Sequence, residues 1–300
     1  ANEAFTEVMH NYVYTDFMPV VNAVLMVGIN IAILLGGVQK GIERLSTITM
    51  PILFLLLAVF CCYTLTLDGA GQGVKFFLSP DFSKITPSVV VSAMGQAFFS
   101  LSLGMGILVT YASYFPKDTN LTRTSVTVCI STLLVAILMG LIIFPALTSF
   151  GLSQLWSIAF FALLLIAALT STVSLAEVPI AYIQHRYNTK RSTAVLVTLL
   201  PIAACAAICA MSFGSLSWIH IMGQSIFSFL DSLTSYIMLP VVALITCIYI
   251  GWFAPKGLMR DQLSHGRARH SMMVPIVIFA IRILAPACII IILVSNLLNT

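Results

Sequence analysis

Charged residues are scarce in this sequence of 300 residues, of which 8% are charged and 60% are hydrophobic. Soluble domains carry about 25% charged residues. A surface that mainly faces water is therefore excluded, although the length alone would suit a soluble two-domain protein. The net charge of +4 does not indicate nucleic-acid binding, because the basic residues follow a membrane topology instead.

Metal, haem and acid–base sites are also lacking. The seven cysteines form no CxxC pair and no Cys/His cluster at metal-ligand spacing, so we expect them to pack as small apolar residues. The five histidines lie in loops or at helix ends, where no facing pair would hold a haem at membrane depth. A membrane enzyme is disfavoured because the sequence has no acid–base or metal cluster at one depth. A channel is disfavoured because no ring-forming charged pore helix is evident.

Long hydrophobic runs dominate the sequence instead. The hydrocarbon core of a bilayer is about 30 Å thick and takes about 20 helical residues. The runs are too long and too uniformly apolar for barrel strands, so the sequence predicts an all-α polytopic membrane protein. The eight runs cover residues 17–36, 46–67, 88–113, 124–147, 155–183, 192–213, 225–252 and 272–297.

Lysine and arginine are unevenly shared between the two sets of alternate loops. Eleven of the 14 lie in one set, two (Lys75 and Lys84) lie in the other, and Arg282 lies within the last run. Because basic loops stay in the cytoplasm, we expect both ends of the chain outside. We expect Arg282 to pair with an acid or to extend toward the cytoplasm, and favour the second. The eleven are Lys40, Arg44, Lys117, Arg123, Arg186, Lys190, Arg191, Lys256, Arg260, Arg267 and Arg269.

An outside N-terminus is unusual for this chain. Residues 1–16 contain three acidic residues, no Lys or Arg, and no secretory signal. We expect an odd number of helices before Ala1; the alternative is a protein whose short N-terminal tail is translocated.

Small and polar residues interrupt the third run at GQAFFSLSLGMG (95–106). Glycine and serine both weaken a helix. A broken membrane helix is tolerated where it lines a cavity, and its free carbonyls and half-helix ends can hold a cation and an anionic group. A small-residue packing face explains the same residues equally well, so both interpretations stay open.

Hydroxyl side chains gather in the fifth run. Spacing of three and four places Ala167, Thr170, Ser171, Ser174 and Glu177 on one helical face. Hydroxyl and carbonyl oxygens are hard ligands that suit Na⁺. Hydroxyls in membrane helices also bond back to their own i−4 carbonyls, and the residues alone slightly favour this second interpretation.

Four segments resemble the neurotransmitter:sodium symporter family. They are GGVQKGIERLSTITMP (36–51), SPDFSKIT (79–86), GQAFFSLSLGMGILVTYASYFPKD (95–118) and AALTSTVSL (167–175). The family has the LeuT-type fold, with two five-helix inverted repeats and broken first and sixth helices. The resemblance implies that the chain begins at the fourth family helix, which agrees with an odd number of preceding helices. It implies one transmembrane domain (1–300) with eight of about eleven helices: the end of the first repeat (17–67), the second repeat (88–252) and an accessory helix (272–297).

The resemblance also implies the site residues. The substrate would be bound by Phe99, Ser100, Ser102, Met105, Ser171 and Leu175. One or two Na⁺ ions would be held by Ser100, Thr132, Ala167, Thr170 and Ser171. Gln96 and Asp231 resemble the outer gate, Tyr114 resembles part of the inner gate, and Gly41 with Pro51 resembles a hinge.

Some positions depart from the family pattern. Thr132 stands where Asn or Asp usually binds the first sodium, and with Ala136 one turn later no acid replaces chloride, so the role of chloride stays open. His185 stands at the position of the inner-gate aspartate. The loop 148–154 lacks the helical lid of the family.

The sequence therefore predicts a sodium-coupled symporter of amino acids that works by alternating access, and not an enzyme. Met105 and Leu175 favour a hydrophobic or aromatic amino acid as the substrate. We expect a multi-pass protein of the cell's inner (plasma) membrane, truncated in this chain. The alternative is a non-transporting membrane scaffold or sensor with a degenerate transporter fold. The sequence determines neither the substrate nor the oligomeric state.

Overall fold

The computed structural model describes residues 12, 14–116, 119–148, 154–255 and 273–299. The chain forms two compact units. Unit 1 combines residues 1–51 with 165–235, and unit 2 combines residues 52–164 with 236–300. Two groups named in the sequence analysis lie outside the described residues. They are the loop residues 149–153 and five of the basic residues expected in the cytoplasm, Lys117, Lys256, Arg260, Arg267 and Arg269.

Seven helices of the described residues are long and apolar enough to cross a membrane, which confirms the polytopic all-α prediction. The predicted number of eight is wrong by one. The third predicted crossing is not one helix but two, α5 (Pro87–Ser100) and α6 (Ile107–Ala112), and each alone is shorter than the bilayer core requires. The seven are Phe17–Leu35, Lys40–Leu65, Leu121–Ala146, Ile158–Tyr187, Arg191–Met211, Ile226–Phe253 and Pro275–Leu298.

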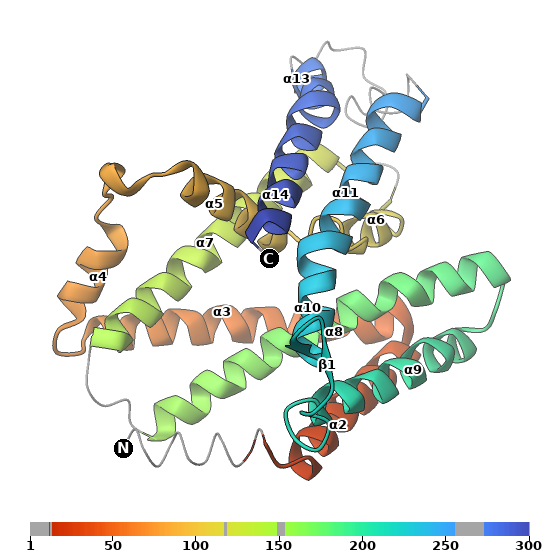
Figure 1. The fold of residues 1–300 in the computed structure, drawn as a ribbon, viewed down its shortest axis with the longest axis horizontal. Coiled ribbons are helices and arrows are strands. Elements are labelled where there is room, and N and C mark those ends of the chain that lie inside the picture. Colours follow the sequence, from red (N-terminus) through yellow and green to blue (C-terminus); the bar gives the residue numbers. More distant parts are fainter. Residues whose placement is uncertain (1–11, 13, 117–118, 149–153, 256–272, 300) are drawn as a thin grey trace. The chain divides into compact units, whose positions relative to one another are not determined.

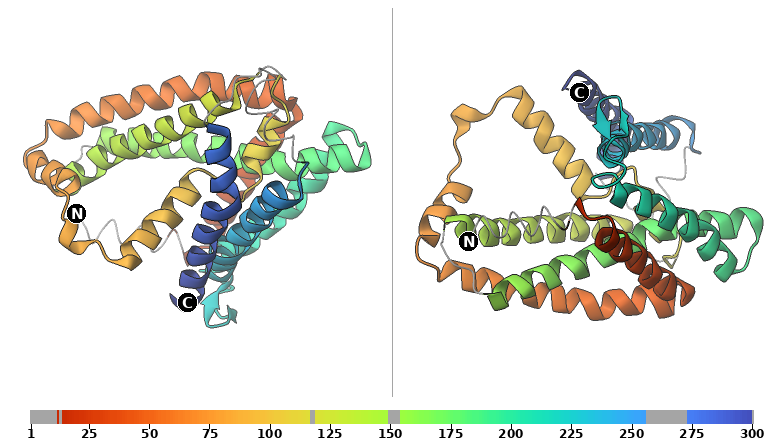
Figure 2. Two further views of the ribbon diagram at one scale, coloured as in Figure 1. Left: turned by 90° about the horizontal axis from the view of Figure 1, so that it is seen from above. Right: turned by 60° about the horizontal axis from the view of Figure 1, so that its bottom comes forward.

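In unit 1, α2 (Phe17–Leu35) and α9 (Arg191–Met211) pack along each other (Figures 1 and 2). After α9 the chain forms a short antiparallel hairpin of β1 (His220–Ile221) and β2 (Gln224–Ser225). The two residues between these strands both have positive φ angles, as the turns that fit the twist of a two-residue hairpin require.

The end of α2 in unit 1 is irregular. A π-helical turn, η1 (Val38–Glu43), follows the helix. Within this turn Gly41 lies so close to the carbonyl oxygen of Ile33 that a Cβ atom would overlap it. Pro51 lies inside the next helix, α3 (Arg44–Leu65), where it removes one backbone hydrogen bond. Gly41 thus lies in irregular helix and Pro51 lies within the α-helix that follows, and the hinge motion stays a prediction.

In unit 2, an apolar core joins segments of α3, α7 (Leu121–Thr148) and α8 (Gln154–Tyr187). Trp156 packs edge-on against Phe60, with ring centroids 5.4 Å apart, and stacks on Tyr63 at 3.8 Å. Offset and edge-to-face pairs of this kind add to the stability gained from buried area. The buried residues of this core are Leu57, Phe60, Cys61, Ile142 and Leu163.

Other elements of unit 2 pack closely against α7 and α11. The short helix α4 (Ala70–Leu78) lies against α7, where Phe77 stacks on Phe144 with centroids 5.1 Å apart. Farther along the chain, α11 (Leu239–Ile248) packs along α14 (Ala285–Asn299) (Figure 1). Of the remaining elements, α10 (Ile226–Ser232) lies in unit 1 and η3 (Leu233–Met238) runs from unit 1 into unit 2. The others belong to unit 2: η2 (Phe82–Lys84), η4 (Tyr249–Phe253), α13 (Met273–Phe279) and η5 (Ala280–Leu284).

Candidate functional site

The third predicted crossing is broken in the structure. Helix α5 ends in a Schellman motif: the Leu103 N–H donates to the Phe98 carbonyl at 3.1 Å, and the Ser102 N–H donates to the Phe99 carbonyl at 2.9 Å. Ser102 takes a φ of +53°, a left-handed conformation that few residues other than glycine adopt. Of the two interpretations of this segment, the broken helix is confirmed.

Gly104 fixes the path of the chain through the break. Its φ is +81°, which glycine adopts without steric cost. A Cβ atom here would also lie 2.5 Å from the carbonyl oxygen of Leu239 and 3.2 Å from the Cβ of Ala243. The break and α11 therefore approach more closely than any other residue at position 104 would allow.

The break leaves backbone acceptors available. Within the described residues, the carbonyl oxygens of Ser100, Leu101 and Ser102 accept no backbone hydrogen bond. An unpaired carbonyl is costly in a membrane unless it lines a cavity or binds a ligand. These oxygens are hard donors of the type that small hard cations prefer, so the segment can hold a cation.

Four of the predicted substrate residues lie at this break in unit 2. Phe99 and Ser100 are exposed in the last turn of α5, and Ser102 and Met105 are half-buried in the break itself. One turn earlier, the Gln96 amide Nε2 donates to the Ser100 hydroxyl at the long distance of 3.4 Å.

The other predicted ligand in unit 2, Thr132, is half-buried within α7. No hydrogen bond joins it to Ser100 in the part of the chain that the structure describes. Its role as a sodium ligand stays a prediction.

The remaining predicted residues lie on α8 in unit 1. The Thr170 hydroxyl donates to the Ala167 carbonyl at 2.9 Å, and the Ser174 hydroxyl donates to the Thr170 carbonyl at 2.9 Å. Bonding back to the helix is therefore the arrangement present, although a donating hydroxyl keeps lone pairs for a cation. Ser171 and Leu175 are exposed on the same helix.

The predicted gate residues are placed separately. Gln96 and Tyr114 belong to unit 2 and Asp231 belongs to unit 1, where its carboxylate accepts a long hydrogen bond of 3.4 Å from the Ser235 hydroxyl. Both gates stay predictions, as do the substrate and sodium ligands on the α5–α6 break and on α8.

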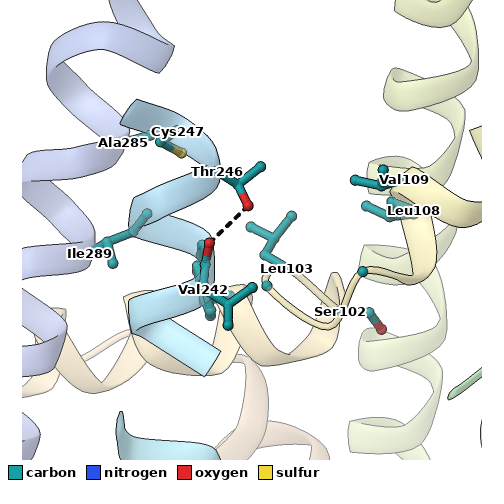
Figure 3. A pocket seen from close by; sticks show the side chains of 13 residues that line it. Ser102, Leu103, Leu108, Val109, Val242, Thr246, Cys247, Ala285 and Ile289 are labelled. Carbon is teal, nitrogen blue, oxygen red and sulfur yellow. Dashed lines mark hydrogen bonds between the residues drawn. The ribbon is translucent and has the colours of Figure 1, made fainter. Parts of the chain in front are cut away.

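A cavity of about 310 Å³ lies in unit 2 beside the break (Figure 3). The break and α6 line one side of it, and α11 with α14 line the other. Its walls are apolar, and the Thr246 hydroxyl already donates to the Val242 carbonyl at 2.8 Å. Among the predicted substrate residues only Ser102 lines this cavity. The cavity can accept an apolar group but offers no ionised side chain.

One polar cluster of unit 1 was not predicted. The Arg191 guanidinium donates two hydrogen bonds to the Glu177 carboxylate, at 2.6 and 2.8 Å, and its Nε donates to the Leu34 carbonyl at 2.9 Å. The Glu177 side chain is 0% exposed. Two features of the sequence could have indicated this ion pair: Glu177 is an acid within an apolar helix, which needs a partner, and Arg191 is a basic residue at the start of the next helix.

Comparisons with known proteins agree with this architecture. The family model described as the sodium:neurotransmitter symporter family matches residues 9–148 and 142–300. An uncharacterised sodium-dependent transporter of Bacillus subtilis, YhdH, is 33% identical over 90% of this chain and 65% of its own length. A second uncharacterised sodium-dependent transporter, from Haemophilus influenzae, is 36% identical over 91% of this chain and 64% of its own length.

A solved structure shows the same fold. The crystal structure of MhsT in complex with L-phenylalanine matches with a TM-score of 0.84 and 35% identity, over 97% of this chain and 71% of that chain. A polytopic bundle with one broken helix is typical of secondary transporters, and the match confirms the LeuT-type fold.

This chain belongs to the sodium:neurotransmitter symporter family. It spans slightly less than two thirds of the length of the curated relatives given above.

Proposed function

We propose that the protein containing this chain is a sodium-coupled symporter of amino acids that works by alternating access. The observation that supports this most directly is the break between α5 and α6, with three carbonyl oxygens that accept no backbone hydrogen bond in the described residues. Broken helices in secondary transporters hold ions and substrate near the middle of the membrane. The relatives described as sodium-dependent transporters support the coupling ion, and give no support to a scaffold or sensor.

We propose one set of sodium ligands in each unit. Ser100 and Thr132 would contribute from unit 2, and Ala167, Thr170 and Ser171 would contribute from unit 1. The arrangement requires the Thr170 hydroxyl to offer a lone pair to the ion while it still donates its hydrogen bond to the Ala167 carbonyl. One or two ions would bind, with basic loops on the cytoplasmic side of the plasma or inner membrane.

The proposed substrate is a hydrophobic or aromatic amino acid. Phe99, Met105 and Leu175 offer apolar surface, and Ser100, Ser102 and Ser171 offer hydroxyls for its polar groups. The related structure of MhsT contains L-phenylalanine, which makes phenylalanine the first substrate to measure.

Uptake by the purified protein in proteoliposomes tests the proposal. We expect phenylalanine uptake when an inward sodium gradient is imposed, and loss of uptake when choline replaces sodium. Uptake of equal rate in choline would exclude sodium coupling. Absence of uptake of every apolar amino acid, in a protein that binds sodium, would exclude the substrate class alone.

The sodium ligands are tested by replacing two hydroxyls of α8. Thr170→Ala with Ser171→Ala should raise the sodium concentration for half-maximal uptake by at least about tenfold, the equivalent of about 1.4 kcal/mol. The matched control is Ser174→Ala, whose hydroxyl lies one turn away, bonds the Thr170 carbonyl and is not a proposed ligand. Equal sodium dependence in both variants would contradict the assignment.

A further inference from the structure

Arg282 is a charged residue within a membrane-spanning helix, and a hydrogen bond to the backbone holds one edge of its guanidinium. It lies in the π-helical turn η5, and its Nε donates to the carbonyl oxygen of Gly251 at 2.6 Å. Gly251 lies in a second π-helical turn, η4, and is buried. A Cβ atom at Gly251 would approach the Arg282 Cγ to 3.1 Å. The two π-helical turns therefore pack closely against each other at Arg282.

The charge distribution places the guanidinium toward the cytoplasmic end of its membrane span. Its acceptor Gly251 is two residues from the end of the span Ile226–Phe253. The next loop contains the basic residues that the charge distribution assigns to the cytoplasm. Tyr249 and Trp252 are 62% and 68% exposed, as in the aromatic belts found at the level of lipid headgroups.

The other edge of the guanidinium is available. Within the described residues, Arg282 has no carboxylate partner and no hydrogen bond besides that to Gly251. The two terminal nitrogens form a planar fork that binds a phosphate with two parallel hydrogen bonds. An uncompensated charge within a membrane is costly, so an anion at this edge would stabilise the structure.

We propose that Arg282 binds the phosphate of an anionic phospholipid of the cytoplasmic leaflet. A lipid fits better than free phosphate because the site lies within the span, and because exposed apolar side chains adjoin it. Ile283 and Leu284 are each 55% exposed and provide surface for acyl chains. Gly251 orients the arginine, since its carbonyl takes the Nε hydrogen bond and leaves the fork directed elsewhere.

Fluorescence of Trp252 measures this binding directly. These 300 residues contain three tryptophans, so replacing Trp156 and Trp218, together with any tryptophan of the protein outside this sequence, by Phe leaves Trp252 as the reporter beside the site. The purified protein in mixed micelles is titrated with phosphatidylglycerol or phosphatidylcholine brominated near the headgroup, which quenches tryptophan on contact. We expect the apparent binding of phosphatidylglycerol to be about tenfold stronger than that of phosphatidylcholine, which is equivalent to about 1.4 kcal/mol.

Substitution of the arginine decides the assignment. Arg282→Gln should reduce the preference for phosphatidylglycerol to less than about twofold, whereas Arg186→Gln, an exposed arginine beside Tyr187, should leave it unchanged. An unchanged preference in Arg282→Gln, or equal binding of both lipids by the parent protein, would overturn the proposal. Reversal of quenching by millimolar inorganic phosphate would also overturn it, in favour of a free-anion site.

A second variant covers the case in which Arg282→Gln does not purify as a folded protein. Arg282→Lys keeps the charge but lacks the fork, so it cannot hold Gly251 and two phosphate oxygens together. We expect this variant to show a preference for phosphatidylglycerol at least about threefold weaker than that of the parent protein. A preference equal to that of the parent would contradict the proposal. Transport is not part of either readout, so the proposal stands or falls separately from the proposed symport.

Discussion

Arg191 and Glu177 form a bidentate ion pair, in which the guanidinium donates hydrogen bonds of 2.6 and 2.8 Å to the two carboxylate oxygens. The same guanidinium reaches the Leu34 carbonyl at the end of α2. Three helices of unit 1 therefore meet at one arginine. Since the Glu177 side chain is fully buried and the Arg191 side chain is 19% exposed, water contributes little to solvating either charge.

Removing the arginine should destabilise the protein strongly. Arg191→Met removes the charged partner of the buried Glu177 carboxylate, which costs about 3–5 kcal/mol. We expect a marked fall in the temperature of thermal unfolding in detergent. The pair Glu177→Leu with Arg191→Met should recover part of the loss, because no unpaired charge remains. Arg186→Met is the control, since this arginine is exposed and lies over the ring of Tyr187. A double variant no more stable than Arg191→Met would contradict the argument.

Alanine at position 104 should disrupt the helix break. Gly104 combines a φ of +81° with close approach to the Leu239 carbonyl, and a strained backbone of this kind costs about 1–3 kcal/mol. We expect Gly104→Ala to lower both the unfolding temperature and uptake. Gly95→Ala is the matched control in the same segment: a Cβ there meets no atom within 4 Å, and alanine favours helix by about 0.5–1 kcal/mol. Equal effects of the two substitutions would show that the break tolerates a side chain.

The membrane spans could be predicted because hydropathy is a local property. Each of the seven long helices begins and ends near a predicted run. The break in the third run was not decided by its composition, because serine and glycine serve a packing face as well as a break. Contact between Gly104 and Leu239 favours the break, and a contact between distant segments is invisible to local patterns.

The candidate site shows the same limit. The hydroxyl face of α8 was predicted from helical spacing, and the back-bonds of Thr170 and Ser174 were one of its two interpretations. The ion pair of Glu177 was not predicted, because the position of Arg191 relative to α8 depends on the turn between two helices. Likewise the contact of Arg282 with Gly251 depends on two π-helical turns, which have no clear sequence signal.

The irregular end of α2 gives a test of the predicted hinge. A Cβ atom at Gly41 would overlap the Ile33 carbonyl, whereas a Cβ at Gly28 within α2 meets no atom within 4 Å. Gly41→Ala should therefore force η1 to shift, at a cost of about 1–3 kcal/mol, and reduce uptake. Gly28→Ala should leave both stability and uptake near the parent values. If Gly41→Ala unfolds at the parent temperature, the close approach does not constrain this turn.

The start of α2 provides a pH-dependent contact outside the membrane. The side chain and the backbone N–H of Ser215 both donate to Asp16 and hold the pKa of its carboxyl below the ordinary value of 3.8. The N–H of Ser215 lies 2.9 Å from the Asp16 Oδ1. A carboxyl whose pKa is lowered stabilises the folded contact above its ordinary pKa, and the contribution is lost as the pH falls through the lowered value.

Acid titration of Trp218 fluorescence should reveal this contact, because Trp218 lies three residues beyond Ser215 and is 75% exposed. With Trp156, Trp252 and any tryptophan outside this sequence replaced by Phe, we expect a transition whose midpoint lies below 3.8, the ordinary pKa of the carboxyl. Asp16→Asn should remove the transition, since an amide does not titrate in this range. A midpoint at or above the ordinary value, or a transition that persists in Asp16→Asn, would show that the hydrogen bonds from Ser215 do not stabilise the ionised carboxylate.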